Sequence, residues 1–229
     1  MPNFTYAQIA GMIDHSLLQP VLTDADLDNG CLLARKYEVA SVCIKPYAAK
    51  LAADLLSGSR VAVGTVIGFP HGGHVTAIKQ AEAEQAMADG AAELDMVVNI
   101  GKVLSGDWPY VERDIAAVVE AAHARNSLVK VIFENCFLND EHKIRLCEIC
   151  ANVRADFVKT STGYGESGAT DEDLKLMRKH SPPHVQVKAA GGVRTFDRVL
   201  AVRALGVSRV GATASVAILE ECKKRLGTS

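Results

Sequence analysis

Two lysines at the ends of strand-like runs are the side chains of this chain best suited to chemistry. Lys159 ends the run ADFVK, and Lys188 ends the run HVQVK. Residues 170–180 between them have a helical pattern, so the three segments predict a βαβ unit with two parallel strands. Both lysines then lie at the same edge of the sheet. Because two ammonium groups in one pocket repel each other, one should lose its proton near neutral pH and become a Schiff-base nucleophile.

The elements around these lysines alternate between strand and helix along the whole chain. Helical patterns cover 75–89 and 108–125, and Thr23 with Asp26 and Thr170 with Asp173 resemble capping boxes at the starts of two more helices. Alternation of this kind in 229 residues predicts a single α/β domain over 1–229, a (β/α)8 TIM barrel. Thr5 with Gln8 predicts an extra N-terminal helix by the same capping rule. Eight strand-like runs are expected near 12–16, 39–45, 60–69, 92–98, 127–134, 155–159, 184–188 and 207–211.

Alternation along the strands predicts which charged side chains enter the barrel. Placing the apolar residues of each run against the helices turns Asp95, Lys130, Glu134, Lys159 and Lys188 inward. Buried charges need partners, and such a layer is more often catalytic than structural. We interpret Asp95 as a proton shuttle for the two amines. Lys130 and Glu134 are predicted to support the site by pairing with Asp95 and the lysines.

Glycine turns follow the last three predicted strands, at Gly163, at Gly191 with Gly192, and at Gly211. Freed backbone amides and the amino termini of the next helices favour an anion there, and barrels commonly bind phosphate after strands 7 and 8. Arg194 adds a charge and Thr195 a helix cap. The chain has no nucleotide-binding glycine motif.

Metal or organic cofactors are not expected. His71 with His74 and Cys147 with Cys150 are the spacings closest to metal ligands, and both pairs lack companion ligands in the sequence. Cys43 should point inward as a packed thiol. The net charge of −2 gives no reason to expect nucleic acid or an anionic membrane as a partner. No run is long enough to span a bilayer, and no secretory signal is visible, so we expect a cytoplasmic protein.

Six strings along the chain resemble the deoxyribose-phosphate aldolase family. The most specific features are KTSTG at 159–163 and the second lysine with its downstream GGVRT. Tyr164 stands where some members carry a lysine. The matching strings are IDHSLLQP at 13–20, SVCIKP at 41–46, TVIGFPHG at 65–72, ELDMVVNIG at 93–101, DFVKTSTGYG at 156–165 and VKAAGGVRT at 187–195.

The resemblance implies roles for individual residues. Lys159 would form the Schiff base, Lys188 would be the neighbouring cation that lowers its pKa, and Asp95 would relay protons. Further positions are assigned to substrate or phosphate binding. They are Asp14, Ser16, Cys43, Lys130, Thr160, Gly163, Gly191, Gly192, Arg194, Gly211 and Thr213.

The implied reaction is reversible cleavage of 2-deoxy-D-ribose 5-phosphate to D-glyceraldehyde 3-phosphate and acetaldehyde, in deoxyribose phosphate catabolism. The expected partner is this phosphosugar, and the chain is expected to form a homodimer or homotetramer. Two alternatives stay open at this point. One is a different phosphosugar barrel enzyme, such as an isomerase with Glu134 as its base, and the other is a catalytically silent phosphosugar-binding barrel.

Overall fold

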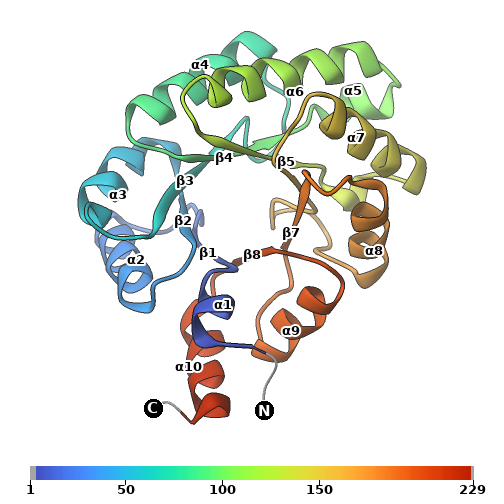
Figure 1. Cartoon of the computed structure of the whole chain (residues 1–229). Helices are drawn as coiled ribbons and strands as arrows, with labels where there is room; N and C mark the ends of the chain where they lie inside the picture. Colours follow the sequence, from blue (N-terminus) through green and yellow to red (C-terminus); the bar gives the residue numbers. More distant parts are fainter. Residues whose placement is uncertain (1–3, 228–229) are drawn as a thin grey trace.

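Eight parallel strands close into one barrel in the computed structural model, which describes residues 4–227 (Figure 1). Each strand pairs with the next in sequence, and β8 returns to β1. The (β/α)8 prediction is therefore confirmed. The predicted domain of 1–229 also includes residues 1–3 and 228–229, which lie outside the described residues. The strands are β1 Ile13–Leu17, β2 Ser41–Ile44, β3 Ala62–Ile67, β4 Glu93–Val97, β5 Leu128–Ile132, β6 Phe157–Lys159, β7 Gln186–Ala190 and β8 Arg209–Ala212.

Helices surround the barrel on its outer side (Figure 1). Their principal members are α2 Asp24–Tyr37, α3 Ala49–Leu56, α4 Thr76–Ala88, α6 Trp108–His123, α7 Asp140–Asn152, α8 Asp171–His180, α9 Phe196–Ala204 and α10 Ser215–Leu226. Three short elements were not predicted, because segments of three to five residues carry no readable periodicity. They are α5 Ile100–Leu104 and the 3-10 turns η1 Pro46–Ala48 and η2 Asn135–Phe137.

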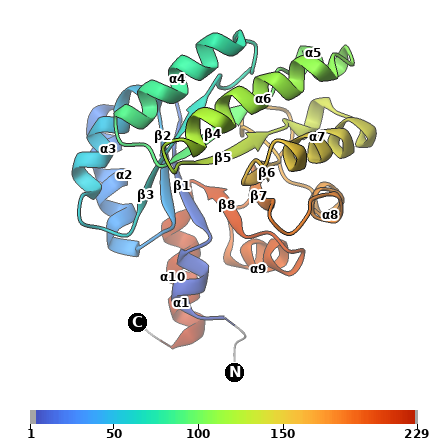
Figure 2. The same cartoon turned by 45° about the horizontal axis from the view of Figure 1, so that its top comes forward.

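Side-chain caps begin the helices that the sequence indicated. Thr5 and Gln8 form a complete capping box that starts the extra helix α1 Tyr6–Ala10, and Thr23 forms the equivalent box at α2. At α8, Thr170 accepts a hydrogen bond from the backbone N–H of Asp173. Helix α1 directly precedes β1 and lies beside α10 (Figure 2). The N-terminal helix is therefore confirmed.

The strands divide apolar from charged side chains as their alternation predicts. Leu94, Met96, Val129 and Val187 face the helices and are fully buried in the apolar core. Their strand neighbours on the opposite face include charged residues that point into the barrel. Across residues 4–227, no helix is both long and apolar enough to cross a membrane.

A buried ion pair outside the barrel joins α4 to α6. Lys79 Nζ lies 2.6 Å from Asp114 Oδ2 and donates to the carbonyl of Val97 at 2.9 Å. The other carboxylate oxygen of Asp114 accepts from Thr76 Oγ1 at 2.8 Å. Both charged side chains are essentially inaccessible to water. The pair therefore fixes two helices against the carboxyl end of β4.

We expect Asp114→Leu to lower the free energy of unfolding by about 3–5 kcal/mol, because it leaves the Lys79 ammonium buried without a counter-charge. Replacing both partners, as Lys79→Met with Asp114→Leu, should recover most of that loss. Urea denaturation measures the difference. The exposed pair Lys50–Asp54 provides the control, and Lys50→Ala should change stability by less than about 1 kcal/mol. A double variant as unstable as the single one would contradict this account.

Candidate active site

Asp95 is the centre of a charged cluster inside the barrel. Its Oδ2 atom lies 2.6 Å from Lys159 Nζ and 2.6 Å from Lys188 Nζ. Its Oδ1 atom lies 2.9 Å from Lys130 Nζ. Asp95 is fully buried, and each of the three lysines is at most 3% exposed. One carboxylate therefore serves three lysines, which brings together four of the side chains that the strand alternation predicted to point inward.

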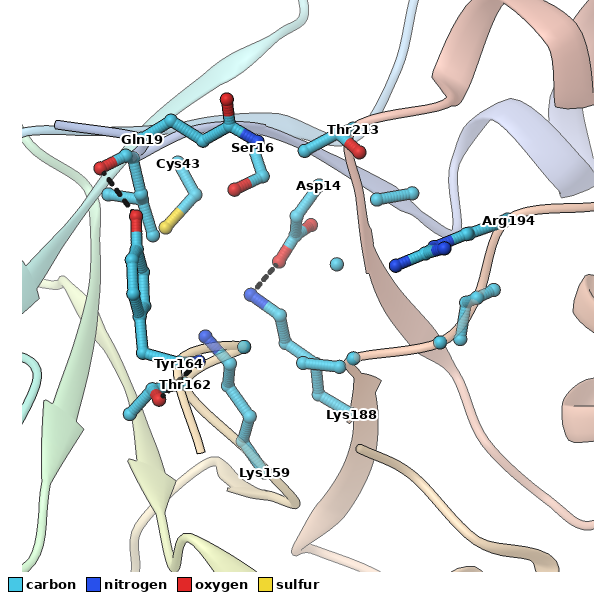
Figure 3. A pocket seen from close by; sticks show the side chains of 18 residues that line it. Asp14, Ser16, Gln19, Cys43, Lys159, Thr162, Tyr164, Lys188, Arg194 and Thr213 are labelled. Carbon is cyan, nitrogen blue, oxygen red and sulfur yellow. Dashed lines mark hydrogen bonds and ion pairs between the residues drawn. The ribbon is translucent and has the colours of Figure 1, made fainter. Parts of the chain in front are cut away.

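The strand register explains why the two catalytic candidates are neighbours. Lys159 on β6 and Lys188 on β7 are directly paired Cα partners in the parallel ladder. The next partner along the same row is Arg209 on β8. Lys188 also reaches across to β1, where its Nζ lies 2.5 Å from Asp14 Oδ2 (Figure 3). The βαβ unit inferred from the sequence thus places the side chains of Lys159 and Lys188 next to each other.

The two lysines have opposite electrostatic environments. Burial lowers the pKa of Lys159 and outweighs the opposing attraction of Asp95, and the charge of Lys188 lowers the pKa further. Burial also disfavours the charged form of Lys188, but Asp14 and Asp95 together raise its pKa above the ordinary lysine value. Lys159 therefore loses its proton more readily than Lys188. Desolvation contributes more than the like-charge repulsion on which the sequence argument relied.

Asp95 and Cys43, which lie beside these lysines, both have shifted pKa values. Although burial favours its neutral form, Asp95 has a pKa well below the usual range because Lys130, Lys159 and Lys188 surround it. Burial raises the pKa of the Cys43 thiol to about 11, and Asp95 adds to the shift. Cys43 is therefore a neutral thiol, with its sulfur 3.9 Å from Asp95 Oδ2.

A cavity of about 240 Å³ opens onto the amines of Lys159 and Lys188. Tyr164 and Arg194 stand on opposite sides of it (Figure 3). Most residues assigned to substrate or phosphate from the sequence lie in its wall. They are Asp14, Ser16, Cys43, Gly163, Gly191, Gly192, Arg194, Gly211 and Thr213.

Close backbone contact shapes the side of the cavity toward Arg194. Gly191 has a φ of +79°, and a Cβ there would lie 2.7 Å from the Cα of Gly168. The backbone N–H of Ala169 donates to the carbonyls of Ala190 and Gly191 across the same contact. Only glycines allow the loops after β6 and β7 to approach this closely. Thr195 caps α9 just beyond this loop, as predicted.

Three residues depart from one of the roles predicted for them, which are charge pairing for Glu134 and substrate contact for Thr160 and Lys130. Glu134 follows the end of β5 with a φ of +57°, and its carboxylate accepts from the backbone N–H and hydroxyl of Thr162. The expected pairing of Glu134 with Asp95 and the lysines is wrong for this reason. Thr160 hydrogen-bonds both backbone groups of Ala190, and Lys130 lies beneath Asp95. Neither Thr160 nor Lys130 is in the cavity wall.

The structure also adds residues that the sequence argument missed. Arg209 enters the barrel from β8 and bonds Asp14 and Glu93, and alternation along 207–211 could have indicated it. Leu18 and Gln19 line the cavity from the loop after β1. The phenol of Tyr164 donates to the carbonyl of Leu18 at 3.0 Å, and its ring meets Phe69 edge to face. No sequence pattern pointed to this contact between loops.

The possible metal ligands do not converge in the structure. His71 and His74 are both exposed in the loop after β3. Within the described range of 4–227, no group of three or more His, Cys, Asp or Glu side chains is arranged to hold a metal ion. Cys147 and Cys150 are buried free thiols in α7.

The fold and the site define the class of this protein as a (β/α)8 barrel with a cluster of buried lysines beside a cavity. Residues 9–219 match the DeoC/LacD family of aldolases. The chain is 60% identical to the deoxyribose-phosphate aldolase of Rhodopirellula baltica, covering 99% of this chain and 94% of the relative. It is 50% identical to the deoxyribose-phosphate aldolase of Clostridium perfringens, covering 93% and 95%.

A solved structure gives the same match. The deoxyribose phosphate aldolase of Aeropyrum pernix, whose structure is described as a unique tetramer, aligns with a TM-score of 0.89 at 29% identity, covering 96% of this chain and 93% of that one. The chain therefore belongs to the DeoC/LacD family of aldolases, which are carbon–carbon lyases. The resemblance seen in the sequence is confirmed.

We expect Lys188→Met to move the activity profile of the enzyme to higher pH by about one unit or more. The substitution removes a cation beside Lys159 and leaves Asp95 to pair more fully with it, so the Lys159 ammonium is stabilised. Part of the lost activity should return as the pH rises and the amine form is restored. A pH–kcat/KM series measures this, with Lys159→Met as the control that no pH restores. An unshifted profile in Lys188→Met would contradict the electrostatic role.

Proposed function

We propose that this chain is a class I aldolase that reversibly cleaves 2-deoxy-D-ribose 5-phosphate to D-glyceraldehyde 3-phosphate and acetaldehyde. The observation that carries the proposal is the buried side chain of Lys159, which faces a cavity beside the side chain of Lys188. The names of the relatives support the same substrate. In this reading the enzyme acts in deoxyribose phosphate catabolism.

The reaction begins when the Lys159 amine attacks the aldehyde carbon of the open-chain sugar. The carbonyl oxygen leaves as water, and the nitrogen becomes an iminium. This cation accepts the electron pair of the C2–C3 bond as the C3 hydroxyl loses its proton and becomes the aldehyde of glyceraldehyde 3-phosphate. The remaining two-carbon enamine is protonated at C2, and hydrolysis of the resulting iminium releases acetaldehyde and restores the amine.

Lys188 and Asp95 are the groups placed to move these protons. Lys188 lines the cavity and Asp95 does not, so we assign the contact with the C3 hydroxyl to Lys188 through a water. As the water takes the hydroxyl proton and passes one to Lys188, Lys188 passes its own proton to Asp95 Oδ2, which lies 2.6 Å away. The same route in reverse returns the proton to C2 of the enamine. Asp95 acts through the lysines, because its carboxylate has no surface in contact with the cavity.

The phosphate belongs at the opposite end of the cavity from Tyr164. Arg194 and Thr213 lie away from Tyr164 (Figure 3). Gly191 and Gly192, just before Arg194 in the chain, and Gly211 also line the cavity. Backbone amides beside the start of α9 favour an anion there, and the guanidinium of Arg194 adds a full charge. Tyr164 and Cys43 lie toward the Lys159 end, where the two-carbon fragment would form.

The alternatives receive less support from this geometry. An isomerase would need Glu134 as a free base, but its carboxylate is bound by Thr162. A silent phosphosugar-binding barrel gives no reason for a desolvated lysine at the cavity wall. We further propose that the enzyme is a cytoplasmic homo-oligomer, a dimer or tetramer, in keeping with the tetramer described for the Aeropyrum pernix relative.

Incubation with acetaldehyde and borohydride should add one ethyl group to Lys159, because the iminium formed there is reduced in place. Peptide mass spectrometry locates the adduct, and Lys159→Met is the matched control. Exhaustive chelation should leave the activity unchanged. Labelling of surface lysines alone would overturn the Schiff-base assignment, and loss of activity on chelation with rescue by zinc would revive a metal role for His71 and His74.

Arg194→Ala should raise KM for the phosphorylated sugar by about 10-fold or more, since a charge-assisted hydrogen bond contributes about 1.5–3 kcal/mol. Its KM for unphosphorylated 2-deoxy-D-ribose should change little. Steady-state kinetics with the two sugars measures the split. Equal losses for both sugars would place the phosphate elsewhere.

A further inference from the structure

Arg209 is a largely buried cation, with 12% of its side chain exposed, that the proposed reaction does not use. Its Nε donates to Asp14 Oδ1 at 2.6 Å, and its Nη2 donates to Glu93 Oε2 at 2.7 Å and to Ser41 Oγ at 3.0 Å. The guanidinium also lies 5.9 Å from the centre of the Phe157 ring. Arg209 is not part of the cavity wall, so it does not contact substrate. It ties β8 to β1, β2 and β4 inside the barrel.

The cluster around Arg209 has unequal numbers of acids and bases. Four side chains can be cations, Lys130, Lys159, Lys188 and Arg209, and three are carboxylates, Asp14, Glu93 and Asp95. With every group charged, the water-excluded interior would hold one excess positive charge, which is costly. With Lys159 as an amine, three cations face three carboxylates. The neutral nucleophile therefore corresponds to charge balance in the cluster.

Apart from Lys159 itself, six charged side chains make up this cluster. They come from β1, β4, β5, β7 and β8. Strand β2 adds the thiol of Cys43, and β3 adds no titratable side chain. Glu134, beyond the end of β5, is bound to Thr162 and takes no part in the cluster.

We propose that Arg209 is a positioning residue that keeps Lys159 in its amine form by occupying Asp14 and Glu93. This inference rests on the Schiff-base function proposed above. Arg209 lies outside the cavity, and it would share with Lys188 the role of lowering the pKa of Lys159.

Arg209 acts on Lys159 through Lys188 and Lys130, each of which lies between two carboxylates. Lys188 Nζ is 2.5 Å from Asp14 Oδ2 and 2.6 Å from Asp95 Oδ2, so it divides its charge between them. Lys130 Nζ is similarly divided between Glu93 at 2.6 Å and Asp95 at 2.9 Å. Without Arg209, Asp14 and Glu93 would draw both lysines toward themselves. Asp95 would then be left to Lys159, and its carboxylate would stabilise the ammonium form.

The test is the pH dependence of acetaldehyde trapping at Lys159, measured as the rate of adduct formation with borohydride. Arg209→Met should move the midpoint of this profile alkaline by about one unit or more. Glu93→Gln removes a carboxylate instead, so it should move the midpoint in the acid direction. The double variant Arg209→Met with Glu93→Gln restores balance and should return the midpoint toward that of the unmodified enzyme. Arg209→Lys keeps the charge and should leave the midpoint nearly unchanged.

A purely structural role for Arg209 would reduce the trapping rate at every pH without moving the midpoint, and that result would overturn the inference. So would a double variant shifted as far as Arg209→Met alone. Arg209→Met is replaced in this test if circular dichroism shows that it does not fold. The midpoint of the double variant is then compared with that of Glu93→Gln alone, and it should be more alkaline. Absence of an adduct on Lys159 in the unmodified enzyme is a different result, and it would overturn the proposed function itself.

Discussion

Burial of charge inside the barrel is the constraint on which this site depends. The carboxylate of Asp95 is removed from water and is surrounded by three lysines, so its resting form is an anion that pairs with them. The same burial disfavours the ammonium form of every lysine that lacks enough carboxylate contact. Lys130 and Lys188 each contact two or more carboxylates, whereas Lys159 contacts Asp95 alone. The difference in reactivity between identical side chains follows from this unequal sharing.

The fold supplies that unequal sharing through strand register. Successive strands place Lys159, Lys188 and Arg209 in one row, and β1 closes the barrel so that Asp14 faces the end of the row. The helices contribute by covering the outer faces of the strands, where the apolar side chains are buried. Glycines in the loops after β6 and β7 line the cavity that opens onto Lys159.

Much of this arrangement could be predicted from the sequence, because alternation within strands and capping at helix starts are local signals. They predict that Asp95, Lys130, Lys159 and Lys188 lie inside a barrel, as the structure has them. The pairing predicted for Glu134 is wrong because strand β5 ends at Ile132. Residue 134 has a left-handed backbone conformation, so its side chain no longer follows the alternation of the strand. The inward position of Arg209 was not predicted, because the apolar residues of 207–211 are the signal that indicates this strand. The hydrogen bond from Tyr164 to Leu18 joins residues 146 positions apart, and no local sequence pattern encodes such a contact.

The most direct test of the central claim is to observe the protonation of the interior lysines themselves. Nuclear magnetic resonance of protein labelled at the lysine side-chain nitrogens would follow each amine through a pH titration, with Lys159→Met used to assign the Lys159 signal. We predict that Lys159 loses its proton at a lower pH than Lys130 and Lys188, and that both of those remain ammonium where Lys159 is already neutral. Titration of Lys159 together with Lys188, or above it, would contradict the account.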